Sequence, residues 1–427
     1  MSARPSIRMS VPEIAGHVQA VLAAGRLQVE PALLVHDLDR VRARISALRA
    51  AFPPSTLHAV AVKANPLISV LRACVEAGAG LECASFPEVA CSRAAGCEAE
   101  SIVFDSPAKT IEELRGTLRM GAWLNADNFA ELDRIAAIIA EAEAAPRGVV
   151  GLRVNPEVGA GTIGTTSVGH RASKMGERLA ETQSEILETY ARHSWLNGLH
   201  VHVGSQGCSL EQLVTGAQRV VELAEAIERV APGQLVNLDI GGGLPVAYRD
   251  TDTPPTLEAY ADALRTQVPA LFEGRWKLAT EFGRSVQANA GFAISRVEYV
   301  KPQGDSTLAV VHLGADFLMR PVYNPEDWHH ELVVLDRDGH IKTGALQATD
   351  VGGPLCFGGD LIGRDLQLPA IEPGDLVVIR DTGAYTLSTW SRHCSRSRPA
   401  VMGLDHGAWS EIHAAETPED VIRLWGG

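Results

Sequence analysis

Short apolar runs alternate with longer stretches of helical periodicity over the first two thirds of the chain. Each run ends in a polar residue or a turn, and apolar positions three or four residues apart follow it. Strands that alternate with helices favour a parallel sheet, and eight such units without tight hairpin signals predict a closed (β/α)8 barrel. An open doubly wound sheet is the competing architecture. The predicted strands are His58–Val62, Leu81–Ala84, Ile102–Phe104, Ala122–Leu124, Val149–Val154, Gly198–Val203, Val236–Ile240 and Leu278–Thr280.

The pattern changes near residue 285. Short β-like runs separated by Gly, Pro and Asp turns replace the alternation, and helical periodicity is scarce until the tail. We therefore predict an α/β protein with two domains. A TIM-like (β/α)8 barrel covers residues 38–285, and a C-terminal antiparallel β domain covers 286–427. Residues 1–37, a helical lead-in followed by a short strand, are assigned to the β domain.

Composition and charge restrict the class of protein. At 427 residues the chain is long enough for two domains with large cores. A formal charge of -14 argues against nucleic acid or an anionic membrane as partner. No apolar run approaches the roughly 20 residues that span a bilayer, and residues 1–28 lack the apolar segment of a secretory signal. Seven cysteines without paired spacing indicate a reducing compartment, so we expect a cytoplasmic protein.

Polar residues gather where the predicted strands end, which is where reactive residues sit in barrels of this kind. Lys63 follows one strand, and alternation predicts that it shares a face with Ala59 and Ala61. These small residues leave room above them for a flat ligand. For a lone lysine, a solvated position in a loop is the more common explanation. The other strand ends are Ser85, Asp105, Asn125, Asn155, His202, Gly241 and Glu281.

Two histidines lie two residues apart on one predicted strand. His200 and His202 therefore share a face, and such a pair could ligate a metal ion. The carboxylates that complete such metal sites are not evident in the sequence. The same geometry also lets a flat imidazole stack on a flat ligand. A TIM-barrel metal hydrolase built on the two histidines is thus the second functional hypothesis.

Three consecutive glycines follow another predicted strand. Gly241, Gly242 and Gly243 allow backbone N–H groups to converge on an anion, although such a run is also common in plain turns. The last strand ends in Glu281, three residues before Arg284. The two could form a surface ion pair, or Arg284 could reach the phosphate of the glycine loop while Glu281 faces inward. A lysine, an imidazole, a phosphate cradle and a buried acid are the groups that pyridoxal phosphate requires.

A long Gly-rich loop covers residues 158–176 and follows a strand end. A polar loop of this length inside a compact domain is more often a lid or a binding loop than filler, a flexible excursion being the alternative. Its Lys174 is a candidate substrate ligand.

Taken together, these motifs resemble the barrel-type pyridoxal-phosphate decarboxylases, a family that includes diaminopimelate decarboxylase and eukaryotic ornithine decarboxylase. The resemblance runs in the family's order from about residue 33 to 404, so it covers nearly the whole chain. The matching segments are Ala61–Asn65, Gly151–Pro156, Ser173–Gly176, His202–Ser205, Gly241–Gly243, Glu281–Arg284, Gly353–Cys356 and Gly383–Tyr385.

The resemblance implies a role for each matched residue. Lys63 would bind the aldehyde of pyridoxal phosphate, His202 would stack on its ring, and Glu281 would pair with its pyridine nitrogen. Cys356 would come from the other subunit of a head-to-tail homodimer and protonate the substrate carbanion, whereas Arg320 would hold a substrate carboxylate. The residues that would hold the phosphate are Ser205, Gly241, Gly242, Gly243, Arg284 and Tyr385.

Some positions depart from the family pattern. Phe357 follows Cys356 where an acidic residue usually reads the far end of the substrate, and Asp360 could compensate if the Gly-Gly turn swings it inward. Residues 391–399 replace a Tyr-Asn-x-Arg-Pro segment, and Glu82 replaces an aspartate. We expect these changes to affect the choice of substrate and to leave the cofactor chemistry intact.

We therefore predict a pyridoxal-phosphate decarboxylase that removes the α-carboxylate of a basic or dibasic amino acid. Diaminopimelate enzymes cleave at a D-configured carbon, so D-lysine or D-ornithine are possible substrates. An amino-acid racemase is the alternative with the same cofactor. Alanine racemase places an arginine against the pyridine nitrogen, however, so Glu281 favours decarboxylation. A non-catalytic cofactor carrier is disfavoured, because single-domain carriers lack a counterpart of Cys356 and the second domain.

Overall fold

The computed structural model describes residues 8–427, which divide into two compact units. The barrel unit consists of Arg42–Val246 and Thr253–Val286. The β unit consists of the chain up to Val41, the short segment Ala247–Asp252, and Gln287–Gly427.

Eight parallel strands close the barrel unit, as the alternation of strands and helices predicts. Closure comes from β5, which pairs with β4 on one side and with β6 on the other, while the two-residue β7 (Glu177–Arg178) adds to β6. The barrel strands are β2 Leu57–Ala61, β3 Gly80–Cys83, β4 Ile102–Asp105, β5 Trp123–Ala126, β6 Val150–Asn155, β8 Gly198–Val201, β9 Asn237–Asp239 and β10 Lys277–Thr280.

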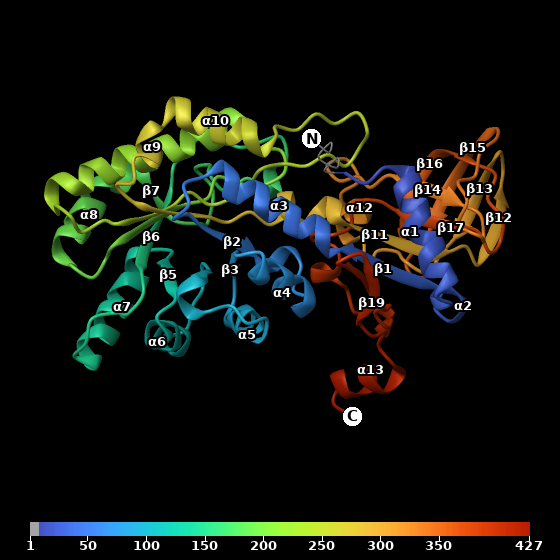
Figure 1. Cartoon of the computed structure of the whole chain (residues 1–427), viewed down its shortest axis with the longest axis horizontal. Helices are drawn as coiled ribbons and strands as arrows, with labels where there is room; N and C mark the ends of the chain where they lie inside the picture. The colour runs from blue at the N-terminus through green and yellow to red at the C-terminus, as the bar shows by residue number, and fades with distance from the viewer. Residues whose placement is uncertain (1–7) are drawn as a thin grey trace. The chain divides into compact units, whose positions relative to one another are not determined.

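Helices connect these strands and cover the outside of the barrel (Figure 1). Several begin at a capping residue whose side chain accepts a hydrogen bond from the N–H three residues later, as at Ser85, Asn128 and Thr256. Among the described residues no helix combines the length and apolarity needed to cross a bilayer. The barrel helices are α3 Leu38–Ala51, α4 Ile68–Glu76, α5 Phe86–Ala94, α6 Ile111–Met120, α7 Phe129–Ala142, α8 Leu179–Arg192, α9 Leu210–Val230 and α10 Leu257–Gln267.

Two sheets form the β unit. The six-stranded sheet has the order β14-β17-β11-β1-β18-β19, and the four-stranded sheet has the order β12-β13-β15-β16. Most neighbours are antiparallel, as predicted, and the pairs β1–β18 and β13–β15 are parallel. The strands are β1 Ala32–Asp37, β11 Gly291–Arg296, β12 Tyr299–Gln303, β13 Ser306–Val310, β14 Leu332–Leu335, β15 Leu346–Gly352, β16 Leu361–Pro369, β17 Leu376–Ile379, β18 Val401–Asp405 and β19 Ala408–His413.

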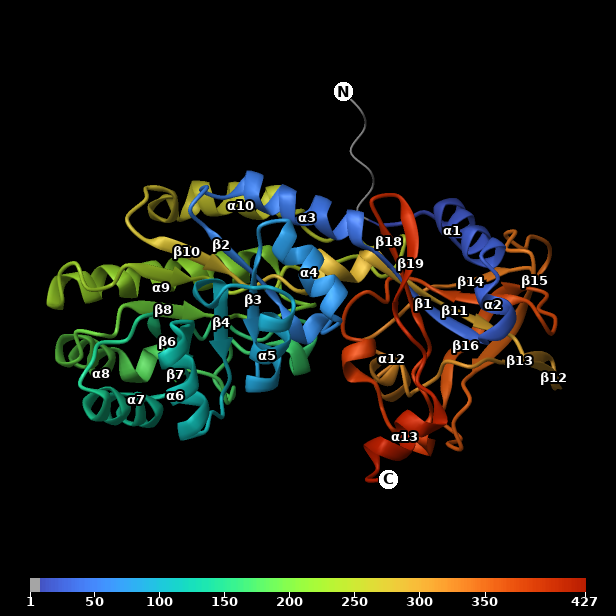
Figure 2. The same cartoon turned by 60° about the horizontal axis from the view of Figure 1, so that its bottom comes forward.

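Helix α1 (Val11–Ala23) packs on the six-stranded sheet of the β unit (Figure 2). Ser10 caps it in a capping box with Glu13, which fixes its first turn. Its buried face and the sheet share one apolar core, to which α1 contributes Val18 and the sheet contributes Phe292. The remaining short helices are α2 Arg26–Val29, α11 Arg284–Gln287, α12 Met319–Tyr323 and α13 Pro418–Leu424.

Candidate active site

The inward-facing side chains of the barrel strands form two layers: an apolar floor deep in the barrel, and a polar layer above it, closer to the C-terminal ends of the strands. Ala59, Val103, Trp123 and Ala279 meet in a buried apolar cluster. Because side chains two residues apart share a face of a strand, the next inward positions lie closer to the strand ends. These positions are Asp105 on β4, Asn125 on β5 and Glu281 directly after β10, all of them buried.

Buried charged side chains form a connected network in this polar layer. Arg153 Nη1 lies 2.6 Å from Asp105 Oδ2, and His200 Nε2 lies 3.4 Å from Glu281 Oε2. His200 Nδ1 lies 3.8 Å from the same Asp105 oxygen, so the imidazole bridges the two carboxylates. From the sequence, Asp105 is predicted only as the end of a strand, and Arg153 is not predicted as a site residue. A charged residue in the centre of an otherwise apolar strand was the signal for Arg153.

The contacts within this network set the protonation states of His200 and Glu281. Burial opposes the charge on His200, but Glu281, Asp105 and Asp239 outweigh burial and raise its pKa to about 9. Burial also opposes the charge on Glu281, but His200 and Lys63 hold the pKa of this carboxyl well below its usual range. Glu281 is therefore ionised at neutral pH. Its Oε1 is buried without a hydrogen-bond partner among residues 8–427, which is costly unless a donor meets it.

A pH dependence of stability follows from His200. A histidine pKa raised from about 6.5 to about 9 contributes stability that is complete below pH 6.5 and is lost as the pH rises through 9. We expect this contribution to be on the order of 3 kcal/mol. In the wild type, urea unfolding should give a lower free energy of unfolding at pH 9.5 than at pH 6. In His200→Gln this difference should be smaller by the contribution of His200. His406→Gln, at an exposed histidine, serves as the control. Equal pH slopes in wild type and His200→Gln would contradict the charged imidazole.

Lys63 lies beyond the strand that was expected to position it. β2 ends at Ala61, and Lys63 occupies the short 3-10 helix η1 (Val62–Ala64), so strand alternation does not direct its side chain. Its Nζ forms an ion pair with Oε2 of Glu82, which is fully buried on β3. Burial raises the pKa of Glu82 to about 8, although Lys63 opposes the shift. Glu82 therefore contacts the lysine directly, and the expectation that its replacement of an aspartate leaves the cofactor chemistry intact stays a prediction.

His202 follows β8, and a glycine amide fixes its ring. Gly242 N–H donates to His202 Nδ1 at 3.2 Å, so this nitrogen acts as an acceptor. Burial lowers the pKa of His202 to about 3, and the imidazole is neutral at physiological pH. His202 therefore offers the face of a neutral ring, as the stacking role requires.

The two histidines do not converge on a common metal site. Of the groups within residues 8–427 whose ligand atoms lie within 4.8 Å of one another, the one that contains His200 consists of Asp105, His200 and Glu281, and none contains His202. Arg153 already supplies a positive charge to Asp105. The geometry therefore does not support the metal-hydrolase hypothesis built on His200 and His202.

The three glycines after β9 leave no room for side chains. A Cβ atom at Gly241, Gly242 or Gly243 would overlap a neighbouring backbone carbonyl, that of Gly204 in the case of Gly243. Gly241 and Gly243 also have φ values of 67° and 105°, which favour glycine. Ser205 follows Gly204, and its hydroxyl accepts a hydrogen bond from Arg284 Nε at 3.3 Å. Bare backbone, a hydroxyl and a guanidinium thus meet at one end of the barrel.

The Gly-rich loop 158–176 is tied to the same end. Ser205 N–H donates to Thr166 O at 3.0 Å, and Thr166 Oγ1 donates to Gln206 O at 2.7 Å. These bonds argue against a free excursion, and the lid role stays a prediction. Lys174 is exposed and forms no ion pair with another residue in the described part of the chain.

The remaining predicted residues belong to the β unit. Arg320 lies on α12, where its guanidinium carbon is 4.8 Å from the ring centroid of Tyr385 and 4.7 Å from that of Trp328. Tyr385 has a φ of 58°, a conformation that is uncommon for a non-glycine residue. The thiol-bearing Cys356 is exposed, whereas four of the seven cysteines are buried.

Asp360 is bound into the fold and offers no free carboxylate. Its Oδ1 accepts a hydrogen bond from Ala315 N–H at 2.6 Å, and its Oδ2 accepts one from Leu355 N–H at 2.8 Å. The residue is 4% exposed, and its carboxylate fills the space where Gly314 and Gly353 lack side chains. The prediction that Asp360 swings inward to contact substrate is therefore corrected: it holds the 353–360 loop in place.

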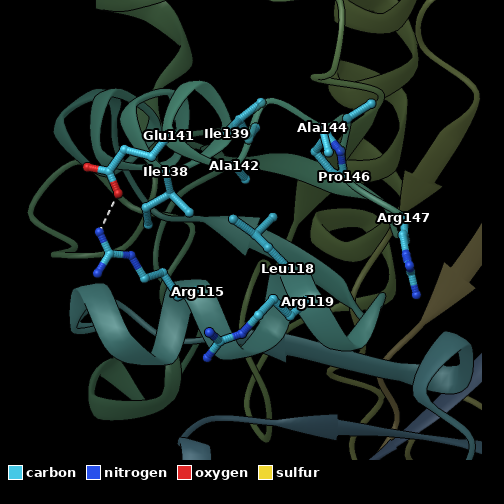
Figure 3. A pocket seen from close by; sticks show the side chains of 11 residues that line it. Arg115, Leu118, Arg119, Ile138, Ile139, Glu141, Ala142, Ala144, Pro146 and Arg147 are labelled. Carbon is cyan, nitrogen blue, oxygen red and sulfur yellow. Dashed lines mark hydrogen bonds and ion pairs between the residues drawn. The ribbon is translucent and has the colours of Figure 1, made fainter.

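A hollow of about 560 Å³ lies elsewhere, on the outside of the barrel between α6 and α7 (Figure 3). Its floor includes Leu118 and Ile138, and Arg119 and Arg147 lie at its edge. None of the predicted site residues lines it. The predicted site residues therefore lie at the strand ends and away from this hollow.

Comparisons with known proteins identify the family of the chain. Residues 38–288 match the family described as pyridoxal-dependent decarboxylase, pyridoxal binding domain. The chain belongs to the pyridoxal-dependent decarboxylases. The cofactor of this decarboxylase is accordingly pyridoxal phosphate. The chain described here is 34% identical to diaminopimelate decarboxylase from Neisseria meningitidis serogroup A over 373 residues. These residues are 86% of this chain and 87% of the relative. The corresponding enzyme of Pseudomonas aeruginosa is 33% identical over 368 residues, 84% of each chain.

Solved structures show the same fold. Diaminopimelate decarboxylase from Helicobacter pylori, in complex with L-lysine, has a TM-score of 0.83 and 27% identity. The match covers 93% of the decarboxylase described here and 97% of the relative. Lysine/ornithine decarboxylase from Vibrio vulnificus, in complex with cadaverine, has a TM-score of 0.77 over 93% of this chain and all of the other. At 24% identity this second likeness shows the fold alone.

Proposed function

We propose that the decarboxylase removes the α-carboxylate of a basic or dibasic amino acid, with the reaction centred on Lys63 and Glu281. The observation that carries this proposal is the state of Glu281. It is a buried, ionised carboxylate with one oxygen that lacks a hydrogen-bond partner within residues 8–427. Such an oxygen suits the protonated nitrogen of a pyridine ring.

The other site residues fit the same cofactor. The side-chain-free loop Gly241–Gly243, together with Ser205 and Arg284, suits the phosphate group, and we assign Tyr385 to the same group by resemblance. His202 presents the neutral ring face that stacking needs. When bound, pyridoxal phosphate supplies the sink for the electron pair that remains when CO2 departs.

The protein's own residues would control the protons of the reaction. His200 is charged because of its contacts with Asp105 and Glu281, and it keeps Glu281 ionised. An ionised Glu281 would in turn keep a proton on the pyridine nitrogen of the bound cofactor. Glu82 has a pKa of about 8 and contacts Lys63 Nζ, so it can hold a proton beside that amine near neutral pH. Cys356 Sγ would deliver the final proton to the α-carbon.

We further propose a homodimer with shared active sites, in which Cys356 serves the barrel of the other subunit. Its exposed position in the β unit supports this assignment. The cytoplasmic location expected from the unpaired cysteines belongs to the same proposal.

The substrate is proposed to be a basic amino acid with a single carboxylate, D-lysine or D-ornithine in particular. The family resemblance implies cleavage at a D-configured carbon. With Phe357 next to Cys356 and Asp360 bound into the fold, this loop offers no acid to the distal amino group of diaminopimelate. Arg320 would hold a carboxylate, either the α-carboxylate before it departs or a distal acid of a dibasic substrate.

Release of CO2 from meso-diaminopimelate and from both enantiomers of lysine and ornithine tests this proposal. We expect a D-configured lysine or ornithine to be the best substrate. Diaminopimelate should react more slowly here than in a relative that carries the acid, because losing an acid beside a distal ammonium costs on the order of 1–3 kcal/mol. A strong preference for meso-diaminopimelate would contradict the argument from Phe357. Loss of optical activity without CO2 would instead indicate a racemase.

A further inference from the structure

A second hollow, of about 470 Å³, lies at the opposite end of the barrel from the predicted site residues. Thr56 directly precedes β2 and Ala77 lies shortly before β3, so the lining surrounds the N-terminal ends of these strands. Helix α3 supplies Arg42, Ser46 and Arg49, whose spacing of four and three residues places them on one face of the helix. No carboxylate is among the described residues that line the hollow. Its volume is within the range of about 300–1,000 Å³ that small-molecule sites occupy.

Two residues of this lining each bury a polar atom that has no partner. His58 is 3% exposed and its Nδ1 lies 2.8 Å from Thr280 Oγ1, but its Nε2 has no hydrogen-bond partner among residues 8–427. The hydroxyl of Thr56 is likewise buried and unpaired within that range. A closed turn positions it, because Thr56 N–H donates to Pro53 O at 2.9 Å. Buried polar groups are normally hydrogen-bonded, so two unpaired ones in the lining of one hollow point to a ligand that pairs with both.

The arginines give the hollow a positive charge. Arg49 Nη1 donates to Ala77 O at 3.1 Å, and no carboxylate of the described residues pairs with its guanidinium. Arg42 Nη2 lies 3.6 Å from Glu76 Oε2, but the Glu76 side chain is more than half exposed, and such surface pairs are weak. Burial lowers the pKa of His58 to about 4, and the charge of Arg49 adds to this shift. The hollow therefore combines guanidinium groups with a neutral imidazole, which suits an anion.

We propose that this hollow binds a phosphorylated small molecule, with Arg42 and Arg49 on its phosphate group. Guanidinium groups hold phosphate oxygens through paired N–H donors, and a hydroxyl such as that of Thr56 adds a neutral donor. Where Nδ1 of His58 accepts from the Thr280 hydroxyl, Nε2 carries the proton and donates as well. Inorganic phosphate shares this chemistry, but the volume of the hollow leaves room for the organic part of an ester. Because the hollow lies away from the strand ends, its ligand does not compete with the cofactor or the substrate.

Calorimetric titration of the holoenzyme tests this proposal. The phosphate of the bound cofactor then occupies its own place at the strand ends, so that added ligand reports on the second hollow. We titrate inorganic phosphate, glycerol 3-phosphate and glycerol into holoenzyme in phosphate-free buffer. Glycerol 3-phosphate should bind once per chain and more tightly than inorganic phosphate, and glycerol should not bind. Absence of phosphate binding at millimolar concentration would overturn the proposal and leave a hollow that holds only water. Binding of inorganic phosphate alone would overturn the assignment to an ester.

The exposed arginine on α3 provides the most direct variant. Arg49→Gln should weaken the binding of glycerol 3-phosphate about 10- to 100-fold, the loss expected for a hydrogen bond to a charged group. The visible absorbance of the bound cofactor should not change, because Arg49 lies away from the strand ends. Arg229→Gln, at an exposed arginine in the last turn of α9, is the matched control and should bind as the wild type does. Undiminished binding by Arg49→Gln would overturn the proposal.

A second variant, Thr56→Val, distinguishes a hydroxyl that binds a ligand from one that serves the fold. The hydroxyl is unpaired among residues 8–427, so a methyl group of the same shape should not lower the free energy of unfolding in phosphate-free buffer. The variant should nevertheless bind glycerol 3-phosphate about 2- to 10-fold more weakly, because a neutral hydrogen bond is lost. A loss of stability with unchanged binding would show that Thr56 serves the fold and would remove it from the proposed site.

Discussion

Replacement of Lys63 by alanine is expected to abolish decarboxylation and to remove the visible absorbance of lysine-bound pyridoxal phosphate. A single positioned acid–base group typically contributes 10²–10⁴-fold, and Lys63 would also carry the cofactor, so activity should fall by at least about 10³-fold. The variant should still fold. Glu82, left without its ion-pair partner, has a pKa of about 8 with the lysine present and would simply become protonated.

Two controls make this result specific. Lys63→Arg keeps a positive charge beside Glu82 but cannot bind an aldehyde in the same way, so it should fold and lack the absorbance band. Lys277→Ala removes an exposed lysine at the start of β10, at the opposite end of the strand from the predicted site residues. This variant should keep both activity and absorbance. A Lys63→Ala protein that retains the visible band would place the cofactor lysine elsewhere in the chain.

The barrel was predictable because its signals are local. Each strand is a short apolar run with its own turn and helix, and the predicted eight runs correspond to β2, β3, β4, β5, β6, β8, β9 and β10. Glu281 and His200 were predictable for the same reason, since period-two alternation directs side chains without reference to other strands. The apolar floor formed by residues such as Trp123 follows the same rule.

Contacts between distant segments were not predictable in this way. Lys63 leaves strand geometry within two residues of the end of β2, and its partner Glu82 comes from the next strand. Asp360 looked available because sequence shows a carboxylate after two glycines but not the two N–H groups that bind it. The stacking of Phe357 on Tyr323 likewise depends on how the 353–360 loop packs against α12.

A mixture of two inactive variants is expected to recover activity if the sites are shared. Lys63→Ala lacks the cofactor lysine, and Cys356→Ala lacks the proton donor, so each homodimer should be inactive. Random exchange of a 1:1 mixture makes half of the dimers hybrid. In each hybrid, one site combines an intact Lys63 with an intact Cys356. The mixture should therefore show about a quarter of wild-type activity.

The expected recovery depends on whether Cys356 serves the barrel of its own chain or that of the partner subunit. If Cys356 served the barrel of its own chain, every site in a hybrid would lack one of the two residues, and mixing would restore nothing. Cys394→Ala, at the other exposed cysteine, is the matched control and should be active before mixing. Subunit exchange must be demonstrated independently, for example by mass spectrometry of tagged chains. Absence of recovery despite demonstrated exchange would show that Cys356 does not act across a dimer interface.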